Sequence, residues 1–222
     1  MMQKHKFVVF DLDDTLYKEI DYLKSAFREI AFFLETQSGL NNLYDEMIRY
    51  YQQGLDVFLE ILNTYHIQVE KEKLIDIYRK HKPNIRLDDE TSQVLEVLSK
   101  ASYYELGLIT DGRFVSQMNK INALGLKKYI KEENIIILEK TRYQKPNEYA
   151  FRLMEERHND FDFIYVGDNP KKDFLAPNRL GWSTICLIND GRNIHKQDNE
   201  LFGDYLPKKR ISSLSELKNV IS

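Results

Sequence analysis

Five short apolar segments constrain the fold of this chain more than any other feature of its sequence. Each has the length and the β-branched or aromatic content of a buried strand. Helical patterns separate the later segments, and strands that alternate with helices predict a parallel, doubly wound α/β sheet. The five predicted strands are residues 7–10, 105–110, 134–138, 161–167 and 183–188.

Two helical patterns between these strands carry boundary signals. Residues 114–126 place apolar side chains on one face, and Gly125 is suited to end that helix. Residues 146–158 begin with Pro146, which is tolerated in a first helical turn. The side chains expected to be buried are Val115, Met118, Ile121 and Leu124 in the first pattern and Tyr149, Phe151 and Leu153 in the second.

The interval between the first two strands is too long for a simple crossover. Roughly ninety residues lie there, with helical periodicity and no strand-like alternation. Gly39, Gly54 and Pro83 mark the breaks between three or four helices. Because a single crossover needs only one helix, these helices predict an inserted α-helical subdomain, or cap. The expected division is a core of residues 1–16 and 87–222 and a helical cap of residues 17–86.

Composition argues against several classes of protein. The 222 residues suffice for one large domain or one domain with an insertion. A formal net charge of −3 is too small to favour nucleic acid or a membrane surface as a partner, and the basic run at 206–210 is interpreted as a solvated face. Cys186 is the only cysteine, so we expect no intramolecular disulfide and a buried structural thiol. Without a signal-peptide pattern or a membrane-length apolar stretch, we expect a soluble, cytoplasmic protein.

Four of the predicted strands are followed by polar residues of complementary chemistry. In a parallel sheet the carboxyl ends of the strands share one edge, and ligands bind at that edge. One polar cluster there would mean little, but four on a single edge indicate a functional site. The residues are Asp11 and Asp13 after the first strand, Thr110, Asp111 and Gly112 after the second, Lys145 after the third, and Asp168 with Asp173 after the fourth.

The chemistry of these side chains favours a bound cation and a bound phosphate. Carboxylates brought together from the first and fourth strands repel each other unless a cation neutralises them. Oxygen ligands without a nearby His or Cys favour Mg²⁺ over zinc or copper. Lys145 supplies positive charge. The Thr110 hydroxyl and the N–H groups of Asp111 and Gly112 offer an anion cradle at a helix N-terminus. Such a set of groups suits phosphoryl transfer.

Four segments of the chain resemble the motifs of the haloacid dehalogenase-like hydrolases, in that family's order and spacing. They are DLDDTL (11–16), ITDG (109–112), KP (145–146) and GDNPKKD (167–173). The helical insert is similar to the family's cap of the first type, and the resemblance covers nearly the whole chain. It implies a Rossmann-like core that binds Mg²⁺. The family's dehalogenases lack the second aspartate of the first motif, so the presence of Asp13 favours phosphoester chemistry.

The resemblance implies a role for each matching residue. Asp11 would be the nucleophile that attacks phosphorus and gives an aspartyl-phosphate. Asp13 would be the general acid that protonates the leaving oxygen, and then the base that activates water. Asp11, the backbone carbonyl of Asp13 and Asp168 would hold Mg²⁺. Asp14 and Thr15 would support the turn.

The remaining matches would bind the phosphoryl group. Thr110 and the Gly112 N–H would bind its oxygens. Lys145 would neutralise charge on the nucleophile and the phosphate, and Asp173 would orient Lys145 or a metal-bound water. Asp111 stands where many members have Asn, and we expect little consequence because the backbone acts at this position.

The leading interpretation is a Mg²⁺-dependent phosphatase of a small phosphorylated metabolite, either a sugar phosphate or a nucleotide monophosphate. A cap that closes over the site would exclude water and leave little room for a macromolecule. Tyr17, Lys18 and Tyr22, at the start of the cap, are the candidate substrate contacts. A phosphomutase is the nearest alternative, followed by a catalytically silent binding protein and a receiver-type signalling domain. A monomer and a homodimer both stay open.

Overall fold

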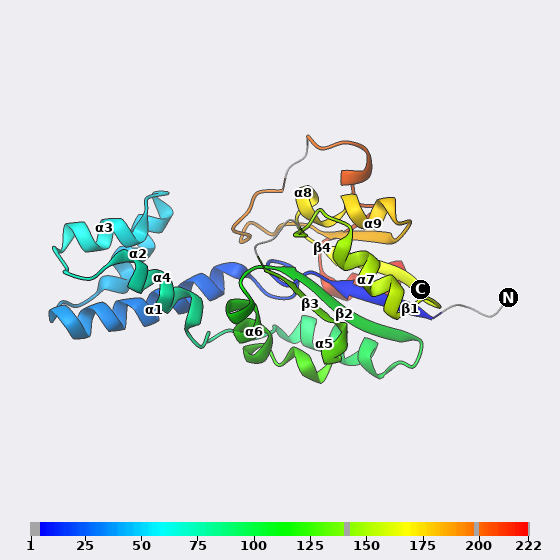
Figure 1. Ribbon diagram of the computed structural model, residues 1–222, viewed down its shortest axis with the longest axis horizontal. Coiled ribbons are helices and arrows are strands. Elements are labelled where there is room, and N and C mark those ends of the chain that lie inside the picture. Colours follow the sequence, from blue (N-terminus) through cyan, green and yellow to red (C-terminus); the bar gives the residue numbers. More distant parts are fainter. Residues whose placement is uncertain (1–4, 140–142, 198–199, 222) are drawn as a thin grey trace.

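The computed structural model describes residues 5–139, 143–197 and 200–221. Its centre is a six-stranded parallel sheet with the order β3-β2-β1-β4-β5-β6 (Figure 1), which confirms the predicted doubly wound architecture. Strand β1 lies in the middle, where Phe10 aligns with Leu108 of β2 and Val166 of β4. The strands are β1 (Lys6–Phe10), β2 (Tyr104–Asp111), β3 (Ile135–Leu138), β4 (Asp162–Gly167), β5 (Ser183–Leu187) and β6 (Lys209–Ile211).

All five predicted strands are present, each within one residue of its predicted ends. Strand β6 was not predicted, because it falls in the basic run at 206–210 that was interpreted only as a solvated face. It is an edge strand of 3 residues in which Lys209 and Arg210 are exposed and Ile211 is buried. So short a strand offers too little alternation to be seen in a sequence.

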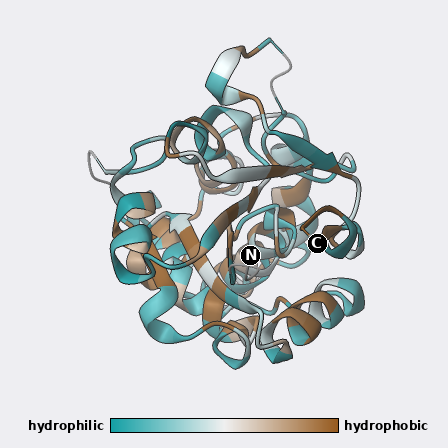
Figure 2. Ribbon diagram, turned by 90° about the vertical axis from the view of Figure 1, so that its right-hand side faces the viewer, coloured by the Kyte–Doolittle hydropathy of each residue, from teal (hydrophilic) through white to brown (hydrophobic). Residues whose placement is uncertain are grey.

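Helices cover both faces of the sheet, because successive side chains of a central strand point to opposite faces. Val8 and Phe10 pack into one apolar cluster, and Phe7 and Val9 pack into another. Figure 2 shows hydrophobic strands in the middle of the molecule. The first face is covered by α5 (Asp89–Lys100), α6 (Phe114–Ala123) and α10 (Leu217–Ile221), and the second by α7 (Tyr149–Arg157), α8 (Pro170–Asp173) and α9 (Leu175–Arg179). Short 3-10 helices lie at Leu126–Lys128, Glu132–Asn134, Gly203–Tyr205 and Leu214–Glu216.

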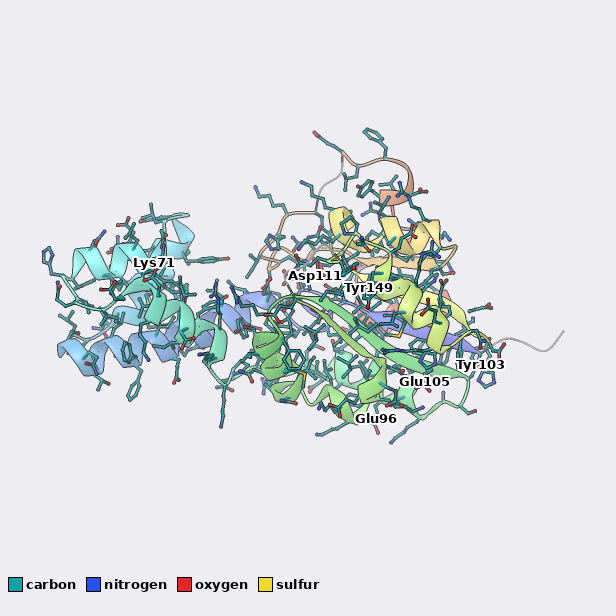
Figure 3. All side chains as sticks on the ribbon, viewed as in Figure 1. Lys71, Glu96, Tyr103, Glu105, Asp111 and Tyr149 are labelled. Atoms are coloured by element: carbon teal, nitrogen blue, oxygen red, sulfur yellow. The ribbon has the colours of Figure 1, made fainter. Side chains whose placement is uncertain are left out.

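Helix α7 differs from its prediction at the first turn. It begins at Tyr149 and not at Pro146, because residues 145–148 form a turn in which Asn147 Oδ1 accepts a hydrogen bond from the Tyr149 N–H (2.8 Å). Phe151 is buried as predicted, whereas Tyr149, labelled in Figure 3, is 47% exposed. The start of the helix therefore lies outside the core.

Helix α6 buries its predicted face except in the first turn, and it buries two polar residues as well. It ends before Gly125, whose left-handed φ of 64° matches the predicted stop. Ile121 and Leu124 are buried as expected and Met118 packs against the core cluster, but Val115 is 49% exposed. Gln117 and Lys120 are also buried. The polar side of this helix thus faces the interior, toward the carboxyl edge of the sheet.

The inserted helices form a separate lobe beyond the carboxyl ends of the strands (Figure 1). They share an apolar cluster of their own, whose fully buried members include Ile30, Met47 and Ile61. Tyr17 and Ile85, where the chain enters and leaves the lobe, pack with the core cluster. The helices are α1 (Glu19–Ser38), α2 (Leu43–Gln52), α3 (Val57–Thr64) and α4 (Lys71–Lys80). The division of the chain at residues 17 and 86 stays a prediction.

In the part of the chain that the structure describes, no helix combines the length and the apolar character needed to cross a bilayer.

Candidate active site

The polar residues that follow the strands meet in one small pocket of about 120 Å³ at the carboxyl edge of the sheet. Asp111, labelled in Figure 3, marks the part of the core that faces the cap. The predicted site residues that line this pocket are Asp11, Asp13, Thr110, Asp111, Lys145, Asp168 and Asp173. The sequence did not indicate four further lining residues, which are Glu19, Asn169, Lys172 and His195.

Lys145 is the centre of the hydrogen bonds inside the pocket. Its Nζ donates to Oδ1 of Asp11 and Oδ1 of Asp173, both at 2.7 Å, and to the hydroxyl of Tyr165 at 2.9 Å. Burial alone would lower the pKa of Lys145, but the carboxylates of Asp11 and Asp173 raise this pKa well above its ordinary value. Lys145 is therefore a permanent cation beside Asp11.

The Asp173 side chain contacts the backbone of the two residues that directly follow β4. Its Oδ2 accepts hydrogen bonds from the N–H groups of Asp168 (3.1 Å) and Asn169 (2.8 Å). Gly167 makes this approach possible, since a Cβ there would lie 2.6 Å from Asp173 Oδ2. The glycine and the aspartate of the GDNPKKD segment are therefore required as a pair.

Three carboxylates come close enough to share one cation. Asp11, Asp168 and Asp173 each offer an oxygen, and these oxygens lie within 4.8 Å of one another. Burial, opposed by Lys145, raises the pKa of Asp11 to about 7. Burial and the charge of Asp173 raise the pKa of Asp168 to about 9. An all-oxygen set of this kind fits a hard divalent cation such as Mg²⁺.

The carboxylate of Asp13 is fixed by groups that the sequence did not reveal. Lys120 Nζ donates to Oδ1 at 2.7 Å and to Oδ2 at 3.0 Å, and Gln117 Nε2 donates to Oδ2 at 2.9 Å. The Tyr17 hydroxyl donates to Oδ1 at 2.5 Å. Burial would raise the pKa of Asp13, but Lys120 and Gln117 outweigh it and lower this pKa. Asp13 is thus a carboxylate with both oxygens bonded.

The anion cradle found after β2 lacks one of the hydrogen-bond donors that the sequence predicted. The Thr110 hydroxyl lies at the pocket and accepts a hydrogen bond from Gln117 Nε2 (2.8 Å). The Gly112 N–H, predicted to bind phosphate, instead donates to the Leu138 carbonyl at 3.0 Å. The pairing of β2 with β3 continues one residue beyond the strand and occupies this donor. Gly112 is needed for another reason, because its φ is 148° and a Cβ would lie 2.9 Å from the Gln117 side chain.

Asp111 contributes through its side chain rather than only through its backbone. Its Oδ1 accepts a hydrogen bond from the Lys145 N–H (3.1 Å), and Lys172 Nζ lies 3.9 Å from its Oδ2. The side chain therefore fastens the turn that presents Lys145. The expectation that the identity of residue 111 has little consequence overlooked this contact.

Residues after β5 close one side of the site. Asn193 Nδ2 donates to Oδ2 of Asp168 at 2.8 Å. The Ile194 N–H donates to Oδ2 of Asp14 at 3.0 Å, while Oδ1 of Asp14 accepts from the Glu19 N–H at 2.9 Å. Asp14, with a left-handed φ of 58°, shapes the turn as expected and also anchors this later segment.

The three candidate substrate contacts of the cap entrance have different surroundings. Tyr17 is buried against Asp13. Lys18 Nζ donates to Asn193 Oδ1 at 2.8 Å, and it does not line the pocket that holds Asp13. Tyr22 lines a neighbouring pocket of about 420 Å³, which also contains Asp13. Lys18 contacts the segment after β5 through Asn193 and Asp190, and its role as a substrate contact stays a prediction.

The chain has recognisable relatives. The haloacid dehalogenase-like hydrolase family matches residues 8–187, and the chain belongs to that family. A glyceraldehyde 3-phosphate phosphatase of Methanocaldococcus jannaschii is 27% identical over 232 residues, which cover 97% of this chain and 96% of that protein. Family membership and a phosphatase relative along the whole chain together support a phosphatase.

Solved structures share the fold. The HAD-hydrolase YfnB of Bacillus subtilis, bound to magnesium, aligns with a TM-score of 0.67 and 19% identity over 99% of this chain and 100% of that one. A 2-haloacid dehalogenase of Pseudomonas syringae aligns with a TM-score of 0.59 and 20% identity over 98% of both chains. These likenesses show the fold, and the fold by itself does not select the reaction.

Proposed function

We propose that this protein is a Mg²⁺-dependent phosphatase that hydrolyses a small phosphorylated metabolite through an aspartyl-phosphate. The observation that carries the proposal is the pairing of Asp11 with Lys145 (2.7 Å) in the pocket that also contains Asp13. A buried carboxylate beside a lysine is a nucleophile with its charge neutralised, and a second carboxylate nearby serves proton transfer.

The reaction has two steps. In the first, an oxygen of Asp11 attacks phosphorus, the bond from phosphorus to the ester oxygen breaks, and the leaving oxygen takes a proton from Asp13, which carries that proton in the complex with substrate. In the second, water attacks the phosphorus of the aspartyl-phosphate and gives a proton to Asp13. The bond between phosphorus and the Asp11 oxygen breaks, which releases inorganic phosphate and restores both side chains. Lys145 and Thr110 bind the phosphoryl oxygens in both steps.

Asp11, Asp168 and the backbone carbonyl of Asp13 would hold Mg²⁺, with Asp173 positioned to orient a bound water. When bound, the ion neutralises charge on the phosphoryl oxygens and aligns them with the nucleophile. Support comes from the three clustered carboxylates, which lie within 4.8 Å of one another and include Asp173.

The substrate class follows from the space beside Asp13. The pocket of about 120 Å³ suits little more than a phosphoryl group, and the adjoining pocket of about 420 Å³ would take the rest of a small molecule. Polar groups from both lobes line the larger pocket, among them Glu19 and Arg79 of the cap and Arg113 of the core. Such a lining suits the hydroxyl or carbonyl groups of a short sugar phosphate. Glyceraldehyde 3-phosphate is the first candidate, because the relative from Methanocaldococcus jannaschii is a phosphatase of that compound.

The test is phosphate release from p-nitrophenyl phosphate and glyceraldehyde 3-phosphate by the purified protein. We expect turnover with Mg²⁺, loss of turnover with EDTA, and recovery on adding Mg²⁺ back. The rate of phosphate release by Asp11→Asn should be lower by roughly 10³-fold or more, while its thermal unfolding shows an intact fold. The control Asp45→Asn changes an exposed residue, and its activity should match that of the wild type. An Asp11→Asn variant of comparable activity would overturn the mechanism. An isomerised sugar phosphate in place of free phosphate would indicate a mutase.

A further inference from the structure

A buried lysine outside the reaction described above contacts Asp13. Lys120 lies on α6, and its side chain is only 5% exposed. Its Nζ contacts both oxygens of the Asp13 carboxylate, at 2.7 Å and 3.0 Å. Burying an ammonium group is costly unless it is paired. A lysine at this position is therefore a specific feature of the site and not a solvated helix residue.

The environment of Lys120 fixes its side chain from both lobes. Glu19 Oε1 lies 3.8 Å from its Nζ, and the ring centroid of Tyr22 lies 4.4 Å from it. Both residues belong to α1, the first helix of the cap, whereas Lys120 belongs to the core. The ammonium group is thus clamped between Asp13 and the base of the cap.

Asp13 depends on side-chain donors for the orientation of its carboxylate. It follows the end of β1, where the chain leaves the sheet for a turn. Each of its oxygens accepts two hydrogen bonds, and Lys120 takes part in both pairs. Without Lys120, Oδ1 would keep only Tyr17 and Oδ2 only Gln117. The carboxylate would then rotate more freely, with Glu19 no longer neutralised beside it.

We propose that Lys120 is a positioning residue that fixes the Asp13 carboxylate in the orientation from which it exchanges protons with the leaving oxygen. The inference rests on the proposed function, since it assigns Lys120 a task within that reaction. Lys120 itself touches neither phosphorus nor the nucleophile. Its effect should therefore be confined to the proton transfer that Asp13 performs.

This restriction gives a measurable signature. An ester with a poor leaving group, such as an alkyl phosphate, needs a proton from Asp13 as the bond breaks. An ester with a good leaving group, such as 2,4-dinitrophenyl phosphate, departs without one. A general acid contributes about 10²- to 10⁴-fold to a step that needs it. Since kcat/KM reports the reaction only as far as formation of the aspartyl-phosphate, it isolates the proton transfer to the leaving group.

The experiment measures kcat/KM for both esters in Lys120→Met, Lys120→Arg and the wild type. Glyceraldehyde 3-phosphate serves as the alkyl phosphate. We expect kcat/KM of Lys120→Met to fall about 100-fold on this ester and less than about 3-fold on 2,4-dinitrophenyl phosphate. Lys120→Arg keeps the charge and should recover most of the loss. Lys100→Met, which removes an exposed lysine paired with Glu96, should match the wild type on both esters.

The outcomes separate this inference from the proposed function. Equal losses on the two esters, or a Lys120→Met variant as active as the wild type on the alkyl phosphate, would overturn the inference alone. A wild-type protein inactive on both esters would overturn the proposed function and the inference with it. If Lys120→Met does not fold, the same comparison of esters in Lys120→Arg decides, because its residual loss must again fall on the alkyl phosphate.

Discussion

Lys145 and Asp173 form an ion pair with an Nζ–Oδ1 distance of 2.7 Å, and their side chains are only 3% and 1% exposed. Asp173 also accepts two backbone N–H groups, from Asp168 and Asn169. This pair therefore connects the loop after β3 with the loop after β4. Asp11 lies on the other side of the same ammonium group, so the position of the Asp11 carboxylate depends on both loops.

Removing the cation should destabilise the fold strongly. Lys145→Met leaves two buried carboxylates without their partner, and breaking a buried pair in this way costs about 3–5 kcal/mol. Urea unfolding in the absence of Mg²⁺ measures the loss in unfolding free energy. Lys80→Met, which breaks only an exposed pair with Asp76, should cost less than about 1 kcal/mol. A Lys145→Met variant as stable as this control would contradict the assigned pairing.

A methyl group at residue 167 should impair the site more than the fold. In Gly167→Ala the new Cβ meets Asp173 Oδ2 at 2.6 Å, so the aspartate has to move away from Lys145. Overpacking of this kind costs about 1–3 kcal/mol, and phosphate release should fall with it. Gly39→Ala is the control. A Cβ at its φ of 73° should lower the unfolding free energy by about 1–2 kcal/mol. Gly39 lies in the cap, however, and the new methyl group would have open space around it. If the two variants lose the same unfolding free energy and both keep full activity, the close approach of Asp173 to Gly167 is not needed for the site.

Asn193 should matter for the cation rather than for the fold. Its Nδ2 donates to Oδ2 of Asp168, and losing such a partner of a metal ligand typically lowers metal affinity about 10- to 100-fold. Asn193→Leu should accordingly need a higher Mg²⁺ concentration for half-maximal activity and bind Mg²⁺ more weakly by calorimetry. Asn63→Leu, an exposed change in the cap, serves as the control. An unchanged Mg²⁺ titration for Asn193→Leu would refute this role.

The thiol of Cys186 should be inert in the folded protein. The residue is fully buried, as the sequence predicted, and burial raises its pKa to about 12. A raised pKa keeps the thiol protonated, so at pH 8 roughly one thiol in ten thousand is the reactive thiolate. Ellman's reagent at pH 8 should therefore find no thiol in the native protein and one thiol in urea. Rapid labelling of the native protein would show that the segment is more open than the structure indicates.

The sequence predicted the sheet well because its strands are buried on both faces. Their apolar runs are continuous and end in turn residues, so the five longest strands could be placed to within one residue. The aspartates and Lys145 were also visible, since each lies in the short segment that follows such a run. Local pattern and position on the sheet edge sufficed for these residues.

Other residues of the site could not be recognised from the local sequence pattern. Gln117 and Lys120 are polar residues three apart on a helix, a pattern that normally marks a solvated face. Asn193 and His195 lie in a segment without regular structure, far in sequence from the residues they approach. Only the packing of α6 and of the segment after β5 against the strand ends makes these residues part of the site. The loss of the Gly112 donor has the same origin, since it depends on the pairing of β2 with β3.

The central place of β1 has a consequence for the synthesis of the protein. The strand that delivers Asp11 leaves the ribosome before the other strands of the sheet, yet its register partners begin at Tyr104 on one side and Asp162 on the other. The cap helices are complete by Lys80 and are built from contacts close in sequence, which form early, whereas pairings distant in sequence form late. The lobe over the site is therefore available before the sheet, and the segment that carries Asp11 waits unpaired until β2 and β4 have been made.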